Sequence, residues 1–325
     1  MNSHYLAWWN VENLFSVKND PDRSDKLERA LGKELTGWNS TVLSKKLSQL
    51  AKVVLQMNGG AGPDILGVCE VENAKVLGKL LEKLIPSGRT YKVVHADTKD
   101  RRGIDVAFIY DSAKYKINAS EVFSHFVLRR NATRDILQVG FTTKPGNNKL
   151  VLMGNHWPSR RGGELESEPY RIMAAETLAY FHQRTMEIDG KLQAVVAMGD
   201  FNDEPFNRSL VEYALSERIE RRVKSARSRS PYFFNLTWEL MGKGAGTHYF
   251  DGEPGMLDQI LVNRPLLRSD SPFTVDKSTL SIVKFPDMVS NSGAPRRFGR
   301  PSSSASFDES GFSDHFPLVV ELNES

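Results

Sequence analysis

Apolar runs bounded by turn-forming residues recur along the chain and predict a fold rich in β-strands. The runs are enriched in β-branched residues, which favour extended backbone. Several runs follow one another with no helical segment between them, which favours a mixed sheet over a regular alternation of strand and helix. The predicted strands cover residues 6–12, 64–69, 91–95, 104–110, 135–142, 149–155, 193–199, 257–262 and 316–322.

Amphipathic segments between these runs predict helices. Residues 41–57 and 74–84 carry apolar side chains on one stripe at helical spacing. A further helix is predicted over residues 168–186, because Ser167 can cap its N-terminus and Pro169 loses no hydrogen bond in a first turn. Strands and helices together predict a layered α/β fold.

The stretch LAWWNVENLF, residues 6–15, combines a strand-like pattern with two polar side chains. Alternate residues of a strand share a face, so Asn10 and Glu12 are expected on the same side as Trp8. A buried carboxylate is costly unless a cation or hydrogen-bond donors meet it. Glu12 therefore needs a partner from elsewhere in the chain.

Composition and charge are those of a globular protein without a strong overall field. The 325 residues are 40% apolar and 26% charged, and the net charge is only +3. Nucleic acid or an anionic membrane is therefore not indicated by charge, and any attraction to phosphate must be local. The single cysteine, Cys69, excludes an intrachain disulfide. No membrane span or secretory signal is recognised, so we expect a cytoplasmic location.

Residues 284–313 form the most irregular tract and are rich in Ser, Gly, Pro and Arg. Loops of this length are usually functional or disordered. The tract carries Arg296, Arg297 and Arg300, for which we consider a role in holding an anionic polymer.

Polar side chains gather where predicted strands begin or end. Each has a structural explanation when taken alone, such as a turn residue or a helix cap. Taken together they favour one site, because strand ends in a layered α/β fold meet at one edge. The residues are Glu70, His156, Asp200, Asn202, Asp258, Asp314 and His315.

Oxygen donors without thiolates suit a hard cation, Mg²⁺ or Mn²⁺. A zinc enzyme is disfavoured by the single cysteine and the absence of an H-E-x-x-H motif. A Ser-His-Asp relay is disfavoured because Ser313, Asp314 and His315 are contiguous. The glycine-rich run GKGAGTH at 242–248 lacks the G-K-[ST] ending of a P-loop.

Seven motifs follow one another between residues 8 and 318: WNVENLF, GVCEVEN, GIDVAFIYD, NHWPSRRGG, GDFND, LDQILV and SDHFPL. This series resembles the endonuclease/exonuclease/phosphatase superfamily, whose fold is that of pancreatic deoxyribonuclease. The resemblance implies one domain over residues 1–325, built as a four-layer sandwich of two packed mixed β-sheets flanked by helices. It also implies a site at the sheet edge.

The resemblance and the donor chemistry suggest a metal site. Glu70 is expected to be the principal ligand of Mg²⁺ or Mn²⁺. Glu12 and Asn10 are expected beside it, holding the waters of the ion or a phosphate oxygen. Asp314 is expected to serve a second metal position or to tune the first.

The same resemblance suggests catalytic roles. His315 is the candidate general base or phosphate-facing imidazole, and Asp258 is expected to orient it. Asp200 is expected to align or deprotonate the attacking water, and Asn202 to hold that water or a phosphoryl oxygen. His156 is expected to donate to a phosphate oxygen or to the leaving group.

Residues for substrate binding are predicted beside the motifs. Arg102 belongs to a pair with Arg101, and Arg160 to a pair with Arg161; arginine pairs suit bidentate contact with phosphate. Asn155 at the end of a strand completes the predicted set.

The leading functional hypothesis is a metal-dependent phosphodiesterase or nuclease acting on nucleic acid or a nucleotide-like diester. A phosphomonoesterase or a lipid-headgroup phosphodiesterase on the same scaffold is the first alternative. A non-catalytic module that binds a phosphate ligand is the second. No aromatic–basic nucleic-acid module is recognised, which weakens the nuclease interpretation, and no protein partner is predicted.

Overall fold

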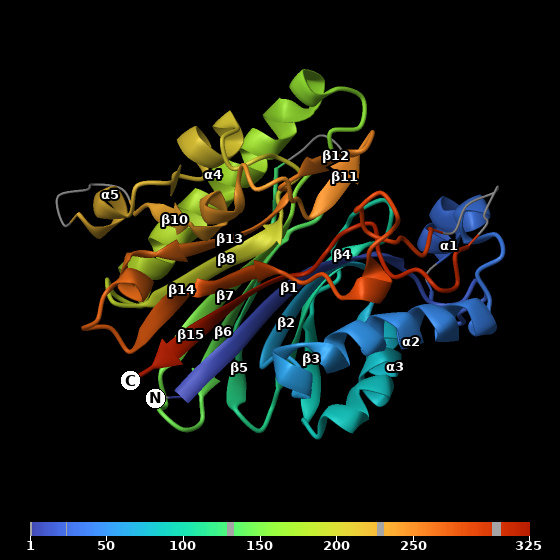
Figure 1. Ribbon diagram of the computed structural model, residues 1–325, viewed down its shortest axis with the longest axis horizontal. Helices are drawn as coiled ribbons and strands as arrows, with labels where there is room; N and C mark the ends of the chain where they lie inside the picture. The colour runs from blue at the N-terminus through green and yellow to red at the C-terminus, as the bar shows by residue number, and fades with distance from the viewer. Residues whose placement is uncertain (1, 24, 129–132, 226–230, 301–306) are drawn as a thin grey trace.

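The computed structural model describes residues 2–23, 25–128, 133–225, 231–300 and 307–325, and its centre is a pair of β-sheets (Figure 1). The first sheet has the order β14 (Phe273–Ile282), β15 (Leu318–Glu324), β1 (Asn2–Leu14), β2 (Ile65–Val71), β4 (Asp105–Asp111) and β3 (Tyr91–His95). The second has the order β5 (Tyr115–His125), β6 (Ile136–Thr143), β7 (Lys149–His156), β8 (Ala194–Asp200), β13 (Asp258–Asn263), β10 (Phe233–Asn235) and β9 (Ser216–Glu217). A separate hairpin joins β11 (His248–Phe250) to β12 (Glu253–Gly255).

Both large sheets are mixed, as the sequence predicts. In the first sheet, β1 runs parallel to β2 and antiparallel to β15. In the second, β7 runs parallel to β8, and β8 runs antiparallel to β13. The chain therefore brings several strand ends to one edge of each sheet, at the opposite end of the molecule from the two termini (Figure 1).

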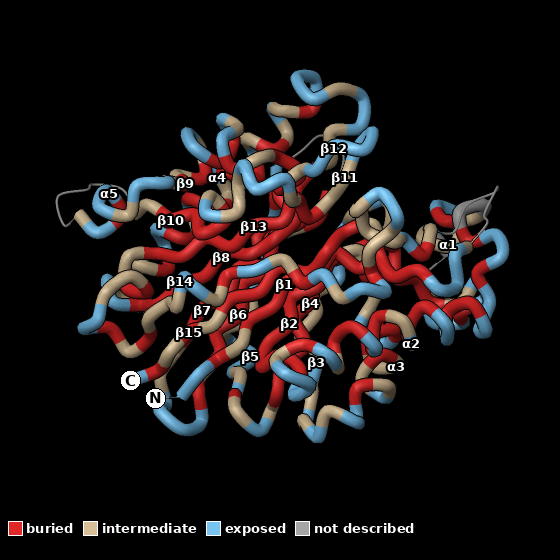
Figure 2. The backbone as a smooth tube through the Cα atoms, viewed as in Figure 1, coloured by how far each residue is buried: buried red, intermediate tan, exposed pale blue. Residues whose placement is uncertain are grey.

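The two sheets pack face to face over an apolar core. Trp8 and Phe108 of the first sheet contribute to it, as do Leu152 and Met198 of the second. Gly67 lies against Trp8, and a Cβ at this position would lie 2.6 Å from a carbon of the indole ring. Glycine is thus required where the large ring crosses the neighbouring strand. Figure 2 shows buried backbone running through the centre of both sheets.

Helices cover the outer face of each sheet. On the first sheet lie α2 (Ser40–Gln56) and α3 (Ala74–Leu84), whose N-termini are capped by the side chains of Asn39 and Asn73. On the second lies α4 (Glu164–Ile188). The resulting order of helix, sheet, sheet and helix confirms the predicted four-layer α/β sandwich.

Short elements complete the described parts of the chain. None of the helices in the described residues is long and apolar enough to cross a membrane. The short helical elements are α1 (Asp25–Leu31), α5 (Glu220–Lys224), a π-turn over Ser209–Tyr213, and 3₁₀ turns over Gly32–Leu35, Asn58–Gly60, Ile85–Ser87, Leu236–Leu240, Arg264–Leu267 and Pro286–Met288.

Two long strands, β5 and β14, are absent from the sequence prediction. Both lie at sheet edges, where only one neighbouring strand pairs with them. Strand β5 is exposed over much of its length and so carries no apolar run. An edge strand that buries little surface leaves a weak pattern in the sequence.

The helix predicted over residues 168–186 begins earlier than expected. It starts at Glu164, so Ser167 lies inside the first turn rather than at the N-cap. The Ser167 hydroxyl donates to the carbonyl oxygen of Gly163 at 2.6 Å. Pro169 is therefore the sixth residue of the helix and not in its first turn as predicted, so its missing N–H leaves the carbonyl oxygen of Leu165 without that intrahelical donor.

The irregular tract at 284–313 packs against the helix-covered face of the first sheet. Met288, Phe298 and Phe312 are buried there in the same apolar cluster as α2 and α3. Residues 301–306 lie outside the described residues. These buried side chains anchor the described parts of the tract to the core, while others such as Arg297 and Arg300 are exposed.

Candidate active site

The strand ends at which functional residues were predicted converge at one edge, between the two sheets. In the strand register, His156 of β7 and Asp258 of β13 both lie opposite Asp200 of β8. In the facing sheet, Asn10 of β1 pairs with the residue that precedes Glu70 on β2. Five separate strands thus deliver polar side chains to one place.

A buried histidine–carboxylate pair forms the centre of the site. His315 Nδ1 lies 2.6 Å from Asp258 Oδ2. The other oxygen of Asp258 accepts a hydrogen bond from Trp8 Nε1 at 3.0 Å. Burial alone lowers the pKa of His315, but the Asp258 carboxylate outweighs it and raises that pKa well above its ordinary value. The imidazole is therefore fixed in orientation and held in its charged form.

The Asp200 carboxylate faces three other polar side chains. Its Oδ2 accepts a hydrogen bond from Asn10 Nδ2 at 3.1 Å, and lies 3.8 Å from His156 Nε2 and 3.9 Å from His315 Nε2. Burial raises the pKa of Asp200 to about 7, with Asp258 adding to the rise. A carboxylate with such a pKa can accept a proton near neutral pH.

Glu70 stands on the opposite side of His156. Its Oε1 lies 3.7 Å from His156 Nε2 and 3.3 Å from a guanidinium nitrogen of Arg102, while Oε2 accepts from the Asn13 amide at 3.0 Å. Burial lowers the pKa of His156 well below its ordinary value, and Arg134 and Arg102 add to the effect. His156 is therefore a neutral imidazole between two carboxylates.

Backbone strain is concentrated at the site. Glu12, Asn13, Glu70 and Asn202 all have φ between 50° and 63°, in the left-handed region that non-glycine residues rarely adopt. Such conformations persist only where the surrounding contacts enforce them, and they often occur at functional sites. Here they turn the chain sharply at three of the converging strand ends.

The structure gives Glu12 different partners from the predicted metal ion. The strand irregularity after Asn10 and the positive φ of Glu12 break the alternation that would place both side chains on one face. The Glu12 carboxylate is fully buried and contacts Arg297 at 2.7 Å, with the amides of Phe298 and Gly299 at 3.1 and 3.2 Å. Glu12 therefore anchors the 284–313 tract, and its predicted part in holding the metal ion stays a prediction.

A buried lysine adds to this anchor. Lys46 Nζ of α2 lies 3.8 Å from Glu12 Oε2 and donates to the carbonyl oxygen of Phe312. Burial lowers the pKa of Lys46 to about 8 and raises that of Glu12. Arg297 pairs with the same carboxylate and Arg296 pairs with Asp308. Both arginine side chains stay partly exposed, and their contact with an anionic polymer stays a prediction.

Two predicted substrate-binding residues are engaged inside the protein. The Asn155 side chain is fully buried; it donates to the carbonyl oxygen of Met153 at 2.9 Å and accepts from Trp157 Nε1 at 3.0 Å. Arg160 donates to the carbonyl oxygen of Asn202 at 2.9 Å and lies 3.3 Å from Asp203. Both side chains therefore support the strand ends. Their role in substrate binding stays a prediction, and Arg160 remains partly exposed.

The remaining predicted residues stay near the site. Asn202 donates a main-chain bond to Asp200 Oδ1 and a side-chain bond to the carbonyl oxygen of Trp157, both at 3.0 Å. Asp314 is partly exposed, with its Oδ2 3.6 Å from Arg297. Arg102 contacts Glu70, as given above, and Arg161 is exposed.

Two residues beside the site were not predicted from the sequence. The ring of His248 on β11 lies 4.7 Å, centre to centre, from that of His315, and burial lowers the pKa of His248 to about 4. Arg134 lies before β6 and donates to the carbonyl oxygen of Trp157 at 2.7 Å. Neither belongs to a strand-end cluster in the sequence, so only the fold reveals its position.

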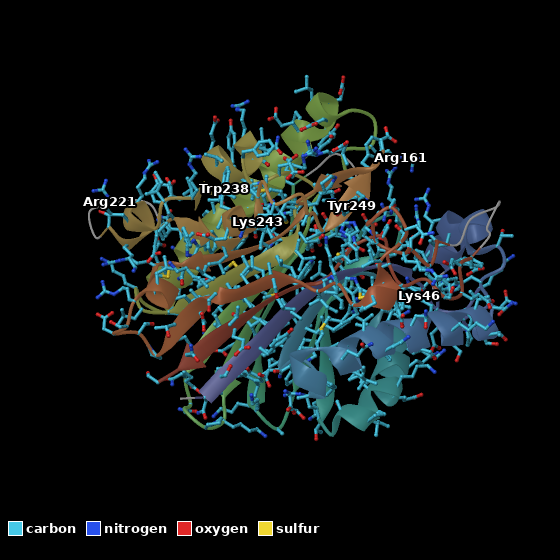
Figure 3. The ribbon with its side chains drawn as sticks, in the orientation of Figure 1. Lys46, Arg161, Arg221, Trp238, Lys243 and Tyr249 are labelled. Carbon is cyan, nitrogen blue, oxygen red and sulfur yellow. The ribbon has the colours of Figure 1, made fainter. Side chains whose placement is uncertain are left out.

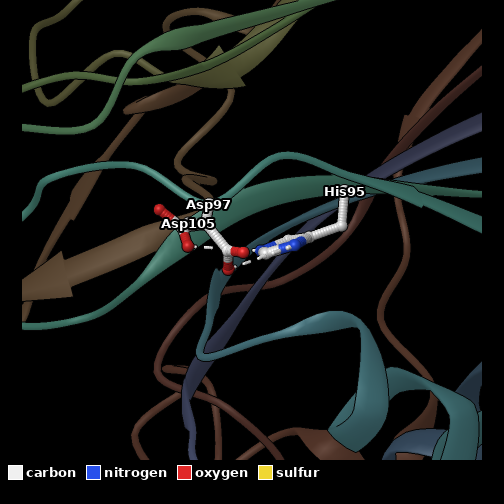
Figure 4. A group of neighbouring side chains, drawn as sticks. All are labelled: His95, Asp97 and Asp105. Carbon is white, nitrogen blue, oxygen red and sulfur yellow. Dashed lines mark hydrogen bonds and ion pairs between the residues drawn. The ribbon is translucent and has the colours of Figure 1, made fainter. Parts of the chain in front are cut away.

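A second histidine–carboxylate group lies near the start of β4 (Figure 4). His95 Nε2 lies 3.2 Å from Asp105 Oδ2, and its Nδ1 lies 3.7 Å from Asp97. Thr98 donates two further hydrogen bonds to Asp105 Oδ1. Protein donors therefore satisfy much of this group, which we interpret as a brace for the turn between β3 and β4.

The donor chemistry at the site fits a hard divalent cation. Glu70, Asp200 and Asn10 offer oxygen atoms, and Cys69, the only cysteine, is buried between the sheets. The oxygens of Glu70 and Asp200 lie within 3.8 Å of the same imidazole nitrogen. Oxygen donors without a thiolate are the set that Mg²⁺ and Mn²⁺ prefer.

Comparisons with known proteins agree with this architecture. The humanized TDP2 of D. rerio matches with a TM-score of 0.59 and 13% identity, covering 99% of both chains. The human nocturnin catalytic domain with bound sulfate has a TM-score of 0.58 and 15% identity, covering 99% of this chain and 94% of its own. A mannosyl-6-phosphatase of Bacteroides thetaiotaomicron has a TM-score of 0.57 and 18% identity, covering 98% and 99%.

No curated protein sequence matches this chain significantly. The family model described as "Endonuclease/Exonuclease/phosphatase family", in contrast, matches residues 5–324. Since the match spans nearly the whole chain, this protein belongs to the endonuclease/exonuclease/phosphatase family and is an enzyme that hydrolyses phosphoester bonds.

Proposed function

We propose that this enzyme is a divalent-metal-dependent phosphodiesterase that acts on nucleic acid or a nucleotide-like diester. The observation that carries the proposal is the arrangement around Asp200. One of its carboxylate oxygens lies within 3.9 Å of the Nε2 atoms of His156 and His315, and the second nitrogen of His315 is fixed by Asp258. A phosphoryl group held between the two imidazoles lies next to a carboxylate that can accept a proton.

The roles follow from the charges of these groups. Asp200 accepts a proton from the attacking water, since its pKa of about 7 allows this near neutral pH. His315, held in its charged form by Asp258, donates to a phosphoryl oxygen and stabilises the charge that grows in the transition state. His156 donates from Nε2 as a neutral imidazole. The bond from the water oxygen to phosphorus forms as the bond to the leaving oxygen breaks, and the leaving oxygen takes a proton from solvent.

Glu70 is the residue that we propose as the principal holder of the metal ion, with Asn10 and Asp314 beside it. When bound, a divalent cation neutralises charge on the phosphoryl and leaving oxygens. Glu70 suits this role because the Asn13 amide holds its Oε2, while its Oε1 faces the site and makes only long contacts with Arg102 and His156.

The charge at the site favours a diester over a monoester. Glu70, Asp200, Asp258 and Asp314 place several carboxylates around the reacting centre, whereas a phosphomonoester carries a second negative charge near neutral pH. The single charge of a diester meets less repulsion there. We therefore retain the phosphodiesterase hypothesis ahead of the monoesterase alternative.

Hydrolysis of bis-(p-nitrophenyl) phosphate and of p-nitrophenyl phosphate tests the proposal. We expect kcat/KM to be at least about tenfold higher for the diester, EDTA to abolish activity, and Mg²⁺ or Mn²⁺ to restore it. Glu70→Ala should raise the metal concentration needed for half-maximal rate. Asp270→Asn, which removes an exposed carboxylate paired with Arg268, is the matched control and should change neither quantity.

Two results contradict the proposal. Full activity after exhaustive chelation would exclude the metal requirement. A higher kcat/KM for the monoester would assign the enzyme to the phosphomonoesterases instead.

A further inference from the structure

A cationic cavity of about 460 Å³ opens beside the proposed reacting centre. It is built from the turn between β3 and β4, the segment before β6, and the loop that leads from β7 into α4. Its lining includes arginines from all three segments. These are Arg101 and Arg102 of the turn, Arg134 of the second segment and Arg161 of the loop; Ser159, Ser167, Tyr170, Asp100 and Glu166 complete it.

Two of the arginines connect the cavity to the reacting centre. Arg102 lies 3.3 Å from Glu70, the proposed metal ligand. Arg134 donates at 2.7 Å to the carbonyl oxygen of Trp157, the residue that follows His156. A group in the cavity therefore lies next to a phosphate held at the centre.

Arg134 is a buried charge whose hydrogen-bonding capacity is only partly used. The residue is 6% exposed. Its Nη1 makes a long contact of 3.4 Å with Asp100, and its Nε finds no hydrogen-bond partner among the residues that the structure describes. A guanidinium carries five N–H donors, and leaving them unmet in the interior is costly. Because Arg134 also lines the cavity, an anion bound there lies beside this buried positive charge.

The cavity carries more positive than negative charge. Four guanidinium groups line it, against the carboxylates of Asp100 and Glu166. The Asp100 carboxylate is buried beside Arg134, whereas Glu166 lies at the exposed start of α4. Arg101 and Arg161 are exposed at the opening, where they can attract an anion from solvent.

We propose that this cavity binds a second phosphate group of the substrate, adjacent to the diester that is cleaved. The inference rests on the proposed phosphodiesterase function and extends it, because it restricts the substrates to diesters that carry a further phosphate close to the scissile one. Guanidinium groups match phosphate oxygens with paired hydrogen bonds. The reacting centre thus binds the singly charged diester of the substrate. The cationic cavity binds its second phosphate group, which carries more negative charge.

A binding experiment tests the cavity without relying on turnover. Inorganic phosphate is titrated into the metal-free protein by calorimetry at low ionic strength. The Arg101→Ala/Arg161→Ala double variant should bind phosphate at least about tenfold more weakly than the wild type, because charge-assisted hydrogen bonds are lost. Arg221→Ala removes an exposed arginine at the opposite end of the molecule (Figure 3) and should bind phosphate as the wild type does.

A kinetic experiment tests the link to the substrate. Thymidine 5′-(p-nitrophenyl phosphate) is compared with the same compound carrying a 3′-phosphate. We expect the wild type to prefer the 3′-phosphorylated diester by about 10- to 100-fold in kcat/KM, and this preference to fall close to one in the double variant. Arg134→Met should have the same effect; if that variant does not fold, as judged by thermal unfolding, the double variant decides.

The two experiments separate failure of the inference from failure of the proposed function. If the wild type hydrolyses both diesters with equal kcat/KM, or if the double variant keeps wild-type phosphate binding, the cavity does not bind a second phosphate and the proposed phosphodiesterase stands. If neither diester is hydrolysed with any metal, the proposed function is overturned, and the inference falls with it even where the titration still shows an anion site.

Discussion

Removing His315 and Asp258 singly and together tests whether they act as one catalytic unit. The variants are His315→Ala, Asp258→Asn and the double variant. His315 Nδ1 lies 2.6 Å from Asp258 Oδ2, and Asp258 is held in turn by Trp8. Asparagine retains the oxygen that accepts from Trp8, but it places an amide group against the imidazole. The ring then loses the partner that fixes its orientation and charge.

The expected magnitude follows from this geometry. A positioned acid–base group contributes roughly 100- to 10,000-fold in rate, which corresponds to about 3–5 kcal/mol of barrier. We expect His315→Ala to lower kcat by that factor, with a smaller change in KM. Asp258 acts mainly through the ring of His315, because burial is the larger cause of the raised pKa of Asp200. Adding Asp258→Asn should therefore lower kcat by no more than about threefold further.

The assay measures kcat and KM on bis-(p-nitrophenyl) phosphate, with thermal unfolding of every variant. Asp111→Asn is the matched control, because it removes a buried carboxylate paired with Arg89 at the far end of β4. That variant should unfold at a lower temperature and keep its kcat. If the two single variants each lower kcat and the double variant lowers it by the product of the two factors, the residues do not act as one catalytic unit. If both single variants unfold at a lower temperature but keep the wild-type kcat, His315 and Asp258 have only a structural role.

Two further predictions concern residues near the end of β1. Glu12→Gln should lower the free energy of unfolding by about 2 kcal/mol or more, because it removes the carboxylate that binds Arg297. Calorimetry should find the Mg²⁺ affinity of this variant unchanged within about twofold. A large loss of Mg²⁺ affinity would instead show that Glu12 is a metal ligand. Burial raises the pKa of Asp20, but bonds from Ser16, the Asp22 amide and Lys75 outweigh it and lower that pKa to about 2. Because its folded pKa is depressed, Asp20 stabilises the protein above its unfolded pKa of about 4, and this contribution disappears as pH falls through about 2. Asp20→Asn should therefore cost about 1–2 kcal/mol in urea unfolding at pH 7 and progressively less below pH 4; an equal cost at pH 7 and pH 2.5 would exclude this linkage.

Local patterns along the sequence determined the layers of the fold. Alternation over β1 predicts that Trp8 and Trp9 lie on opposite faces, and the structure confirms this, with Trp8 between the sheets and Trp9 on the helix-covered face. This works because a buried strand must match the polarity of each face. Edge strands such as β5 were missed, since an edge strand that is largely exposed meets little such constraint.

Only the tertiary structure decided which polar groups meet. The sequence showed that Glu12 needs a partner, but Arg297 lies 285 positions further along the chain, and a bulge turns the carboxylate toward it. Arg134 likewise belongs to no motif, and the cavity exists only because three separate segments fold against one another. Residue periodicity encodes which face of a strand is buried. The partner of a buried charge is set instead by strand order, local backbone strain and the path of distant loops, which no short window of sequence contains.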